Sequence, residues 1–340
     1  MLNSFFRWLP GRAGARGVVD YVLGALALYA LVIVVLMVVF DHEPAPFDVR
    51  EAAARRAGTT TPVRGVTTTV ALIEVTDRLL DKRGGYLSND LMPPGLLMDN
   101  VPNWEWGALV QARDLAIALR NDLSRSQTQS TEDPNLIRAD NKLRIDSESW
   151  MLPAAEHEYA DAVRALEAYV QRISAPDDQQ AQFYARADNL RNWLAVVEKR
   201  LGDLSQRLSA SVGQVRFNTD LAGDTGAERS SQAPDVMVVQ TPWLQIDDIF
   251  YEARGASWAL LHFLRAVEQD FASVLDKRNA LVSLRQIIRE LESTQDMIWS
   301  PVVLNGEGFG FVANHSLVMA SYISRANAAV IELRMLLERG

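Results

Sequence analysis

The feature that most constrains this chain is a run of twenty consecutive residues without a charged side chain, Tyr21 to Phe40. At a rise of about 1.5 Å per residue, a helix of this length spans roughly 30 Å, the thickness of the hydrocarbon core of a bilayer. The run is longer than the apolar part of an ordinary secretion signal, and no small-residue cleavage site separates Phe40 from Asp41. We therefore expect residues 21–40 to be a retained transmembrane anchor that crosses the membrane once.

The charges that flank this run predict its orientation. Three arginines precede it within residues 1–20, whereas Asp41 and Glu43 follow it. Because positively charged flanks stay in the cytoplasm, residues 1–20 are expected to form a cytoplasmic tail and residues 41–340 to lie across the membrane. In a Gram-negative cell, this orientation places the protein in the bacterial inner membrane with a single pass and a periplasmic C-terminal domain.

Composition restricts what the exported part can be. The chain has 340 residues, 48% hydrophobic and 23% charged, which is enough apolar material for a large folded domain. Of its 34 basic and 43 acidic residues, three arginines and one aspartate lie in residues 1–20, so 31 basic and 42 acidic residues give residues 41–340 a formal charge of −11. Such a domain offers no broad cationic surface to a nucleic acid or to anionic lipid. The lack of cysteine excludes disulfides and thiol chemistry.

Helical patterns dominate the rest of the sequence. Residues 41–65 contain several Pro and Gly and are expected to be a tether with at most one short helix, Val49–Ala57. Residues 66–340 contain long stretches without Gly or Pro, which predict a mainly α fold, a long-helix antiparallel bundle with irregular loops. Polar breaks near 124–135 and 219–235 are typical of mobile loops. The apolar segments that flank the second break are expected to pair as a small β-ribbon.

Two segments have heptad spacing. Apolar residues recur at intervals of 4, 3, 4, 3 and 4 between Leu190 and Leu208. The same rhythm runs from Tyr159 to Ile173, and Pro176-Asp177-Asp178 between the two segments is typical of a turn. We expect an antiparallel coiled-coil hairpin, although heptads are also compatible with a homo-oligomer. Farther along, residues 256–300 lack Gly and Pro, which predicts one long helix or two that meet near 276–279.

The most unusual loop is residues 84–107, GGYLSNDLMPPGLLMDNVPNWEWG. Its glycines, prolines and two tryptophans exceed what a plain connector needs, so a ligand- or partner-binding loop is one interpretation. The alternative is a structural lid, in which Asp99 or Asn103 caps the next helix. In that alternative the top of the bundle is plugged by Leu91, Leu96, Leu97 and Met98.

A second candidate loop, residues 305–316, carries alternating glycines. They do not form a dinucleotide-binding fingerprint, and a turn before a final helix capped by Asn314 is the alternative interpretation. From the two loops together we predict ten ligand- or partner-binding residues, namely Tyr86, Asn89, Asp90, Asp99, Asn100, Trp104, Glu105, Trp106, Glu307 and Phe309.

Catalytic patterns are weak throughout the sequence. The four histidines have no metal-ligand spacing, and neither a nucleophile elbow nor a phosphate loop is present. We therefore expect no metal and no cofactor, and the sequence favours a role other than catalysis. One enzymatic alternative is a peptidoglycan-acting hydrolase or lytic enzyme that uses Glu105 or Glu307 as its acid, which a buried carboxylate in a cleft would support and exposure of both would exclude. Another alternative is a lipid or small-molecule binding module with a pocket between its helices.

Together with the apolar run, four segments carry a resemblance to a known family: GGYLSNDLMPPG, DNVPNWEWG, TPWLQIDDIFYEARGASWALLHFLRAV and NGEGFGFVANHSLVMASYISRANAAV. The chain resembles an uncharacterised proteobacterial inner-membrane family, the domain of unknown function numbered 2333, over nearly its whole length. The resemblance implies a single-pass envelope protein and supplies no reaction, cofactor or catalytic residue.

These observations together predict a periplasmic interaction or scaffolding domain that acts in the cell envelope. Its expected partners are the inner membrane, through residues 21–40, and either an envelope protein or a cell-wall glycan. No nucleic-acid partner is expected.

Overall fold

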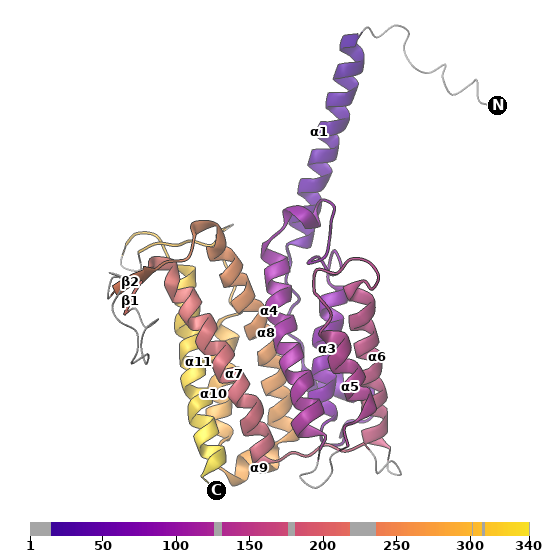
Figure 1. Cartoon of the computed structure of the whole chain (residues 1–340), viewed down its shortest axis with the longest axis vertical. Coiled ribbons are helices and arrows are strands. Elements are labelled where there is room, and N and C mark those ends of the chain that lie inside the picture. Colours follow the sequence, from indigo (N-terminus) through magenta and orange to yellow (C-terminus); the bar gives the residue numbers. More distant parts are fainter. Residues whose placement is uncertain are drawn as a thin grey trace, which may run out of the picture.

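The computed structural model describes residues 15–125, 131–175, 181–217, 236–300, 302–307 and 310–339. In this part of the chain, one long helix, α1 (Ala15–Phe40), projects from one end of a helical bundle (Figure 1). The mainly α fold predicted from the sequence is confirmed. The predicted loops near 124–135 and 219–235, and the predicted turn at 176–178, fall wholly or partly outside the described residues.

Ten further α-helices make up the described bundle, and the longer ones run side by side along one axis (Figure 1). They are α2 (Val49–Ala57), α3 (Val66–Asp81), α4 (Asn100–Ala118), α5 (Pro134–Leu143), α6 (Ala155–Ser174), α7 (Ala187–Ser209), α8 (Ile246–Asp270), α9 (Ala272–Lys277), α10 (Leu281–Ser293) and α11 (His315–Glu338). The described residues also contain the predicted ribbon, in which β1 (Gln214–Phe217) pairs antiparallel with β2 (Val236–Val239).

Local sequence explains where several helices begin and end. The Asp48 carboxylate accepts hydrogen bonds from the backbone N–H groups at the start of α2, and Gly58, with φ +66°, ends that helix in the left-handed conformation. Asp99 caps α4 as the lid interpretation expected. The Asn314 side chain accepts from the N–H of Leu317, so the predicted cap of the final helix is confirmed.

The closest approach between helices is where α4 crosses α8. A Cβ atom on Gly107 would lie 1.9 Å from the carbonyl oxygen of Glu252, and one on Gly255 would lie 1.9 Å from the carbonyl oxygen of Trp104. Neither position has room for a side chain, and the missing side chains let the two backbones touch. The ring of Trp104 then packs 5.1 Å from that of Trp258, between centroids, beside the crossing.

The helix pairing differs from the predicted hairpin. The Leu190–Leu208 stripe of α7 is buried as its spacing predicts, but α7 packs against α11, whereas α6 packs against α5 and α3. The predicted α6–α7 hairpin is therefore wrong, because a heptad stripe fixes which face of a helix is buried and not which helix covers it. Residues 256–300 are not one continuous helix, because α8 ends at Asp270, the short α9 follows it, and α10 begins at Leu281. The predicted break near 276–279 lies between α9 and α10, but the stretch holds three helices and not two.

Alternation of helix direction sorts the described loops to the two ends of the bundle (Figure 1). We call the end from which α1 departs the anchor end. It carries the segments 41–47, 82–99, 144–154, 240–245, 294–300, 302–307 and 310–314, together with the ribbon. The opposite end carries the α2–α3 loop, α9 and the end of α11. Both candidate loops of the sequence, 84–107 and 305–316, thus begin or lie at the anchor end.

Candidate functional site: the junction between α1 and the bundle

The junction between α1 and the bundle is an extended segment, residues 41–48, that lies against α8. The Arg254 side chain is buried, and its Nε donates to both carboxylate oxygens of Glu43, at 2.8 and 2.6 Å. Burial raises the pKa of Glu43, and the adjacent guanidinium opposes that rise. A charge-assisted pair of this kind fixes both partners. Glu43 lies only three residues beyond the end of α1, so the pair holds the base of the anchor helix.

The same guanidinium also binds the segment that follows α10. Nη1 of Arg254 donates to the carbonyl oxygens of Thr294 and Asp296, both at 2.9 Å, and Nη2 donates to that of Gln295 at 3.2 Å. One buried cation therefore joins the junction segment, α8 and the end of α10. Buried charges are stable only when they are paired and hydrogen-bonded in this way.

A second fixed point of the junction lies about two turns farther along α8. The backbone N–H of Phe47 donates to Nε2 of His262 at 3.0 Å, and Nδ1 of His262 lies 2.7 Å from the carbonyl oxygen of Trp258. These partners require the neutral tautomer with its proton on Nδ1. Burial lowers the pKa of His262 to about 3, so the ring is neutral throughout the physiological range. The guanidinium carbon of Arg78 lies 4.0 Å from the centre of the Phe47 ring, which places that ring between a cation and an imidazole.

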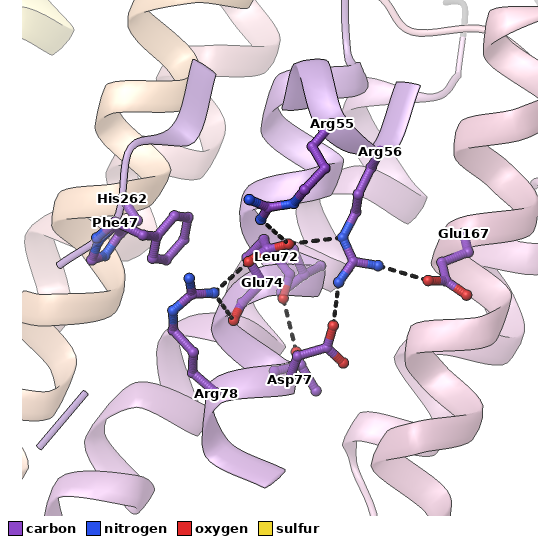
Figure 2. A network of polar contacts seen from close by, with 10 residues as sticks. Phe47, Arg55, Arg56, Leu72, Glu74, Asp77, Arg78, Glu167 and His262 are labelled. Carbon is purple, nitrogen blue, oxygen red and sulfur yellow. Dashed lines mark hydrogen bonds and ion pairs between the residues drawn. The ribbon is translucent and has the colours of Figure 1, made fainter. Parts of the chain in front are cut away.

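Next to Phe47, a charged cluster joins α2, α3 and α6 (Figure 2). Nε of Arg56 lies 2.8 Å from Glu74 and its Nη1 lies 2.6 Å from Glu167, while its Nη2 binds Asp77. Arg78 also binds Glu74. Burial acts to raise the pKa of Glu74, but the hydrogen bonds and charges of Arg78 and Arg56 together outweigh burial and lower it. The paired charges brace α2 against the bundle directly beneath the junction.

Several cavities adjoin the junction. One, of about 560 Å³, lies between residues 42–45 and the charged cluster on α2 and α3. Another, of about 330 Å³, lies on the other side of the segment, against Trp104, Tyr251 and Arg254. A third, of about 370 Å³, opens between α8, α10 and α11, and its lining is largely apolar. Most residues that line the first cavity are charged, and the cluster carboxylates of Glu74 and Asp77 are bound by arginines.

Glu105, one proposed hydrolase acid, is buried and serves the loop that precedes it. Its carboxylate binds the ammonium group of Lys82 and accepts hydrogen bonds from the backbone N–H groups of Leu87 and Ser88, both at 2.9 Å. Burial raises the pKa of Glu105, while Lys82 opposes the rise. Glu105 lines none of the three cavities described above, and Glu307 is exposed. The Glu105 carboxylate thus ties the start of α4 to Lys82 and to the backbone of the preceding loop.

The other predicted loop residues divide into two groups. Tyr86, Asn89 and Trp104 are buried, and the Asn89 amide donates to the carbonyl oxygen of Ser149 at 2.9 Å, which ties two loops of the anchor end together. The exposed or half-exposed residues are Asp90, Asp99, Asn100 and Trp106, and Phe309 lies outside the described residues.

The lid interpretation expected four side chains to fill the top of the bundle, and it is wrong for three of them. Leu91, Leu96 and Leu97 are exposed, whereas Met98 is half-buried. The buried side chains of the loop are those near its two ends, and its middle turns outward. The sequence analysis also missed Glu43, Phe47, Arg254 and His262. The only clue to the last two is that a cation and an imidazole lie eight residues apart in an otherwise apolar stretch.

One comparison with known proteins gives a match, and it includes α1, the junction and the bundle together. A family model described as an uncharacterized protein conserved in bacteria, DUF2333, matches residues 14–340. No curated protein and no solved structure matches the chain. The match extends from the start of α1 to the end of the bundle and confirms the resemblance drawn from the sequence. The chain therefore belongs to the bacterial family DUF2333.

Proposed function

We propose that this protein is a single-pass inner-membrane scaffold, whose helical domain lies in the periplasm and positions an envelope partner at a fixed distance from the membrane. One helix of the described chain, Val18–Phe40, is long and apolar enough to span a bilayer, with a mean hydropathy of 3.0 over its best window and none of that window buried in the bundle. From Val18 to Val32 this helix exposes its side chains on all sides, which suits it to lipid and not to water.

The observation that carries the proposal is the fixed junction. A flexible tether lets a domain sample many orientations, whereas Glu43 and Phe47 are bound to buried partners on α8 within seven residues of the end of α1. The orientation of the bundle relative to the anchor is thereby set. Fixed presentation of this kind serves a scaffold, because a bound partner is then held at a defined height and direction.

Topology is tested with reporters on the full chain. A phosphatase that is active only in the periplasm and a fluorescent protein that folds only in the cytosol are fused in turn to the C-terminus. We expect phosphatase activity without fluorescence, because the arginines lie before the span and the acidic residues after it. Fluorescence without phosphatase activity would place the bundle in the cytosol and refute the proposal.

Scaffolding is separated from hydrolysis with the purified full chain in lipid nanodiscs. We expect the purified chain to release no soluble fragments from peptidoglycan. In a second experiment, crosslinking in living cells, we expect an equimolar complex with one envelope protein. Release of fragments that the Glu105→Gln substitution abolishes would favour the hydrolase.

The third cavity gives specific support to one other function, a lipid or small-molecule binding module. Its lining includes Phe250, Ile298, Met319 and Tyr322, and it lies near the anchor end. A mainly apolar pocket of about 370 Å³ is large enough for part of an acyl chain. Native mass spectrometry of the full chain tests this function. The function requires that the wild type carries a bound lipid and that the Met319→Trp variant, in which the larger side chain fills the cavity, does not.

A further inference from the structure

We propose that the anchor end of the bundle is itself a membrane-contact surface, where apolar side chains of several loops insert into the interfacial layer of the bilayer. The occupant of this surface is the lipid surface around α1. This inference rests on the proposed function, because it requires α1 to span the membrane.

The distribution of exposed apolar side chains carries the inference. Four segments of the anchor end each present one large apolar side chain to solvent, and we call these four residues the tips. Met92 is 73% exposed, Leu152 89%, Trp243 78% and Trp299 91%. They come from positions far apart in the sequence, and the alternation of helix direction brings them to one end (Figure 1). Exposed apolar groups gathered on one face of a protein mark an interaction surface.

The position of α1 identifies what this surface meets. Glu43 is bound to Arg254 only three residues beyond Phe40, so the anchor end cannot lie far from the bilayer that α1 enters. A Cβ atom on Gly84 would lie 2.7 Å from the Phe40 ring, which shows that the loop before α4 touches the last turn of α1. A membrane that holds α1 therefore meets these loops.

Burial along α1 supports contact at membrane depth. Ile33, Leu36, Met37 and Phe40 are half-buried, whereas the residues between them are exposed. Their spacing of three and four marks a single face of α1, so other parts of the protein cover that face over about 10 Å of helix. Interfacial segments reach about 5–10 Å into the boundary between headgroups and acyl chains, which is a comparable depth.

The chemistry of the tips indicates how the surface binds. Tryptophan is enriched where membrane meets water because its ring is apolar and its N–H is polar. Acidic residues lie among these tips, including Asp90, Asp99 and Asp247, and residues 41–340 carry a net negative charge. Attraction to anionic headgroups therefore does not drive this contact. Burial of apolar side chains does, so the contact is insensitive to salt.

One of the tips, Leu152, has an unusual backbone conformation. Leu152 has φ +55°, in the left-handed region that bulky residues rarely adopt. The side chain gains no burial within the protein in return, since it is 89% exposed. Insertion into lipid would supply the missing burial, and residues held in such conformations cluster at binding sites.

The chain lacks cysteine, so single-cysteine spin labels can test the surface on the otherwise unchanged full chain. Met92, Leu152, Trp243 and Trp299 are each replaced by cysteine, and the protein is reconstituted into vesicles of phosphatidylethanolamine and phosphatidylglycerol. Collisions of each label with oxygen, which concentrates in lipid, are compared with collisions with a water-soluble nickel chelate. The matched controls are Val282→Cys and Val63→Cys, because Val282 and Val63 are 79% and 51% exposed at the opposite end. Val32→Cys in α1 reports whether the anchor itself lies in lipid.

We expect the four tip labels to favour oxygen, as Val32→Cys does, and the two control labels to favour the nickel chelate at any salt concentration. If the tips favour nickel while Val32→Cys favours oxygen, the membrane-contact surface is refuted and the proposed function stands. Tip labels shielded from both reagents would mean that a protein or a second copy covers this end, which also refutes the inference. If Val32→Cys favours nickel, α1 is not in the membrane and the proposed function itself fails.

Discussion

The ring of Phe47 stacks on the ring of His262, with centroids 3.9 Å apart and planes within 9° of parallel, while the Phe47 N–H donates to Nε2 of the same imidazole. One side chain thereby binds both the backbone and the ring of a residue 215 positions earlier in the sequence. The hydrogen bond requires neutral His262, since a protonated Nε2 cannot accept one. One of the two attachments of residues 41–48 to α8 therefore depends on the protonation of one histidine, and the other is the Glu43–Arg254 pair.

We expect the stability of the bundle to fall as the pH is lowered from about 6.5, the ordinary pKa of histidine, towards about 3, the lowered pKa of His262 in the folded state. Between these values the unfolded chain binds a proton that the folded chain does not, so acid favours unfolding by up to about 1.4 kcal/mol per pH unit. Above pH 6.5 this contribution is fully present. The free energy of unfolding of the full chain in detergent, measured at several pH values, checks the prediction.

His262→Gln is the control for this pH dependence. Its amide oxygen can accept from the Phe47 N–H, but the side chain does not titrate. Other buried groups, Glu105 and Asp270 among them, have a raised pKa and act in the opposite direction, so the difference between wild type and variant is the quantity to compare. Identical curves for the two proteins would show that His262 is not the group responsible.

We expect Arg254→Met to destabilise the bundle by about 3–5 kcal/mol, because Glu43 and three carbonyl groups lose their partner. The same change should loosen the anchor. In the cysteine-free chain, spin labels at Val32 and Val282 report the distance between α1 and the far end of the bundle, and we expect its distribution to broaden.

Arg325→Met serves as the control. Arg325 lies 2.8 Å from Glu290 but is half-exposed, so its loss should cost less than about 1 kcal/mol and leave the distance distribution unchanged. An unchanged distribution in Arg254→Met would mean that the junction is held by other contacts.

We expect Gly107→Ala and Gly255→Ala each to separate α4 from α8, because the added methyl group would meet backbone atoms that cannot turn aside. Thermal unfolding followed by circular dichroism should show a large loss of stability in both. Gly202→Ala is the matched change, since its Cβ would meet only the side chain of Asn327 at 3.6 Å. It should stabilise α7 by up to about 1 kcal/mol through helix propensity. Equal effects at the three sites would contradict the close crossing.

We expect Glu105→Gln to release the loop 84–99 while the bundle stays folded. The substitution leaves the Lys82 ammonium group without its anionic partner and weakens the acceptors for the Leu87 and Ser88 amides. Hydrogen exchange should show faster exchange at these two amides and unchanged protection in α7 and α11. Unchanged exchange at Leu87 and Ser88 would show that Glu105 does not hold the loop.

Much of the secondary structure follows from short-range patterns. The run from Tyr21 to Phe40 predicts α1 from its length and lack of charge. The Leu190–Leu208 spacing correctly predicts the buried stripe of α7, and Asn314 correctly predicts the start of α11. These features depend on residues a few positions apart, and the helical repeat and the capping geometry impose the same requirements wherever they occur.

Only the tertiary structure decided which surfaces meet and what each polar residue does. It pairs α7 with α11, turns the Glu105 carboxylate towards the loop backbone, and brings Glu43 to Arg254 across 211 positions. A sequence pattern records that a face is apolar or that a side chain is charged, but burial and pairing depend on contacts between distant segments. The sequence by itself therefore determined that the chain has an apolar N-terminal helix long enough to span a bilayer and a bundle of helices. The packing of those helices determined that the segment after α1 is bound to the bundle and that the apolar tips lie at the end where α1 departs, because helix direction and long-range contacts set their positions.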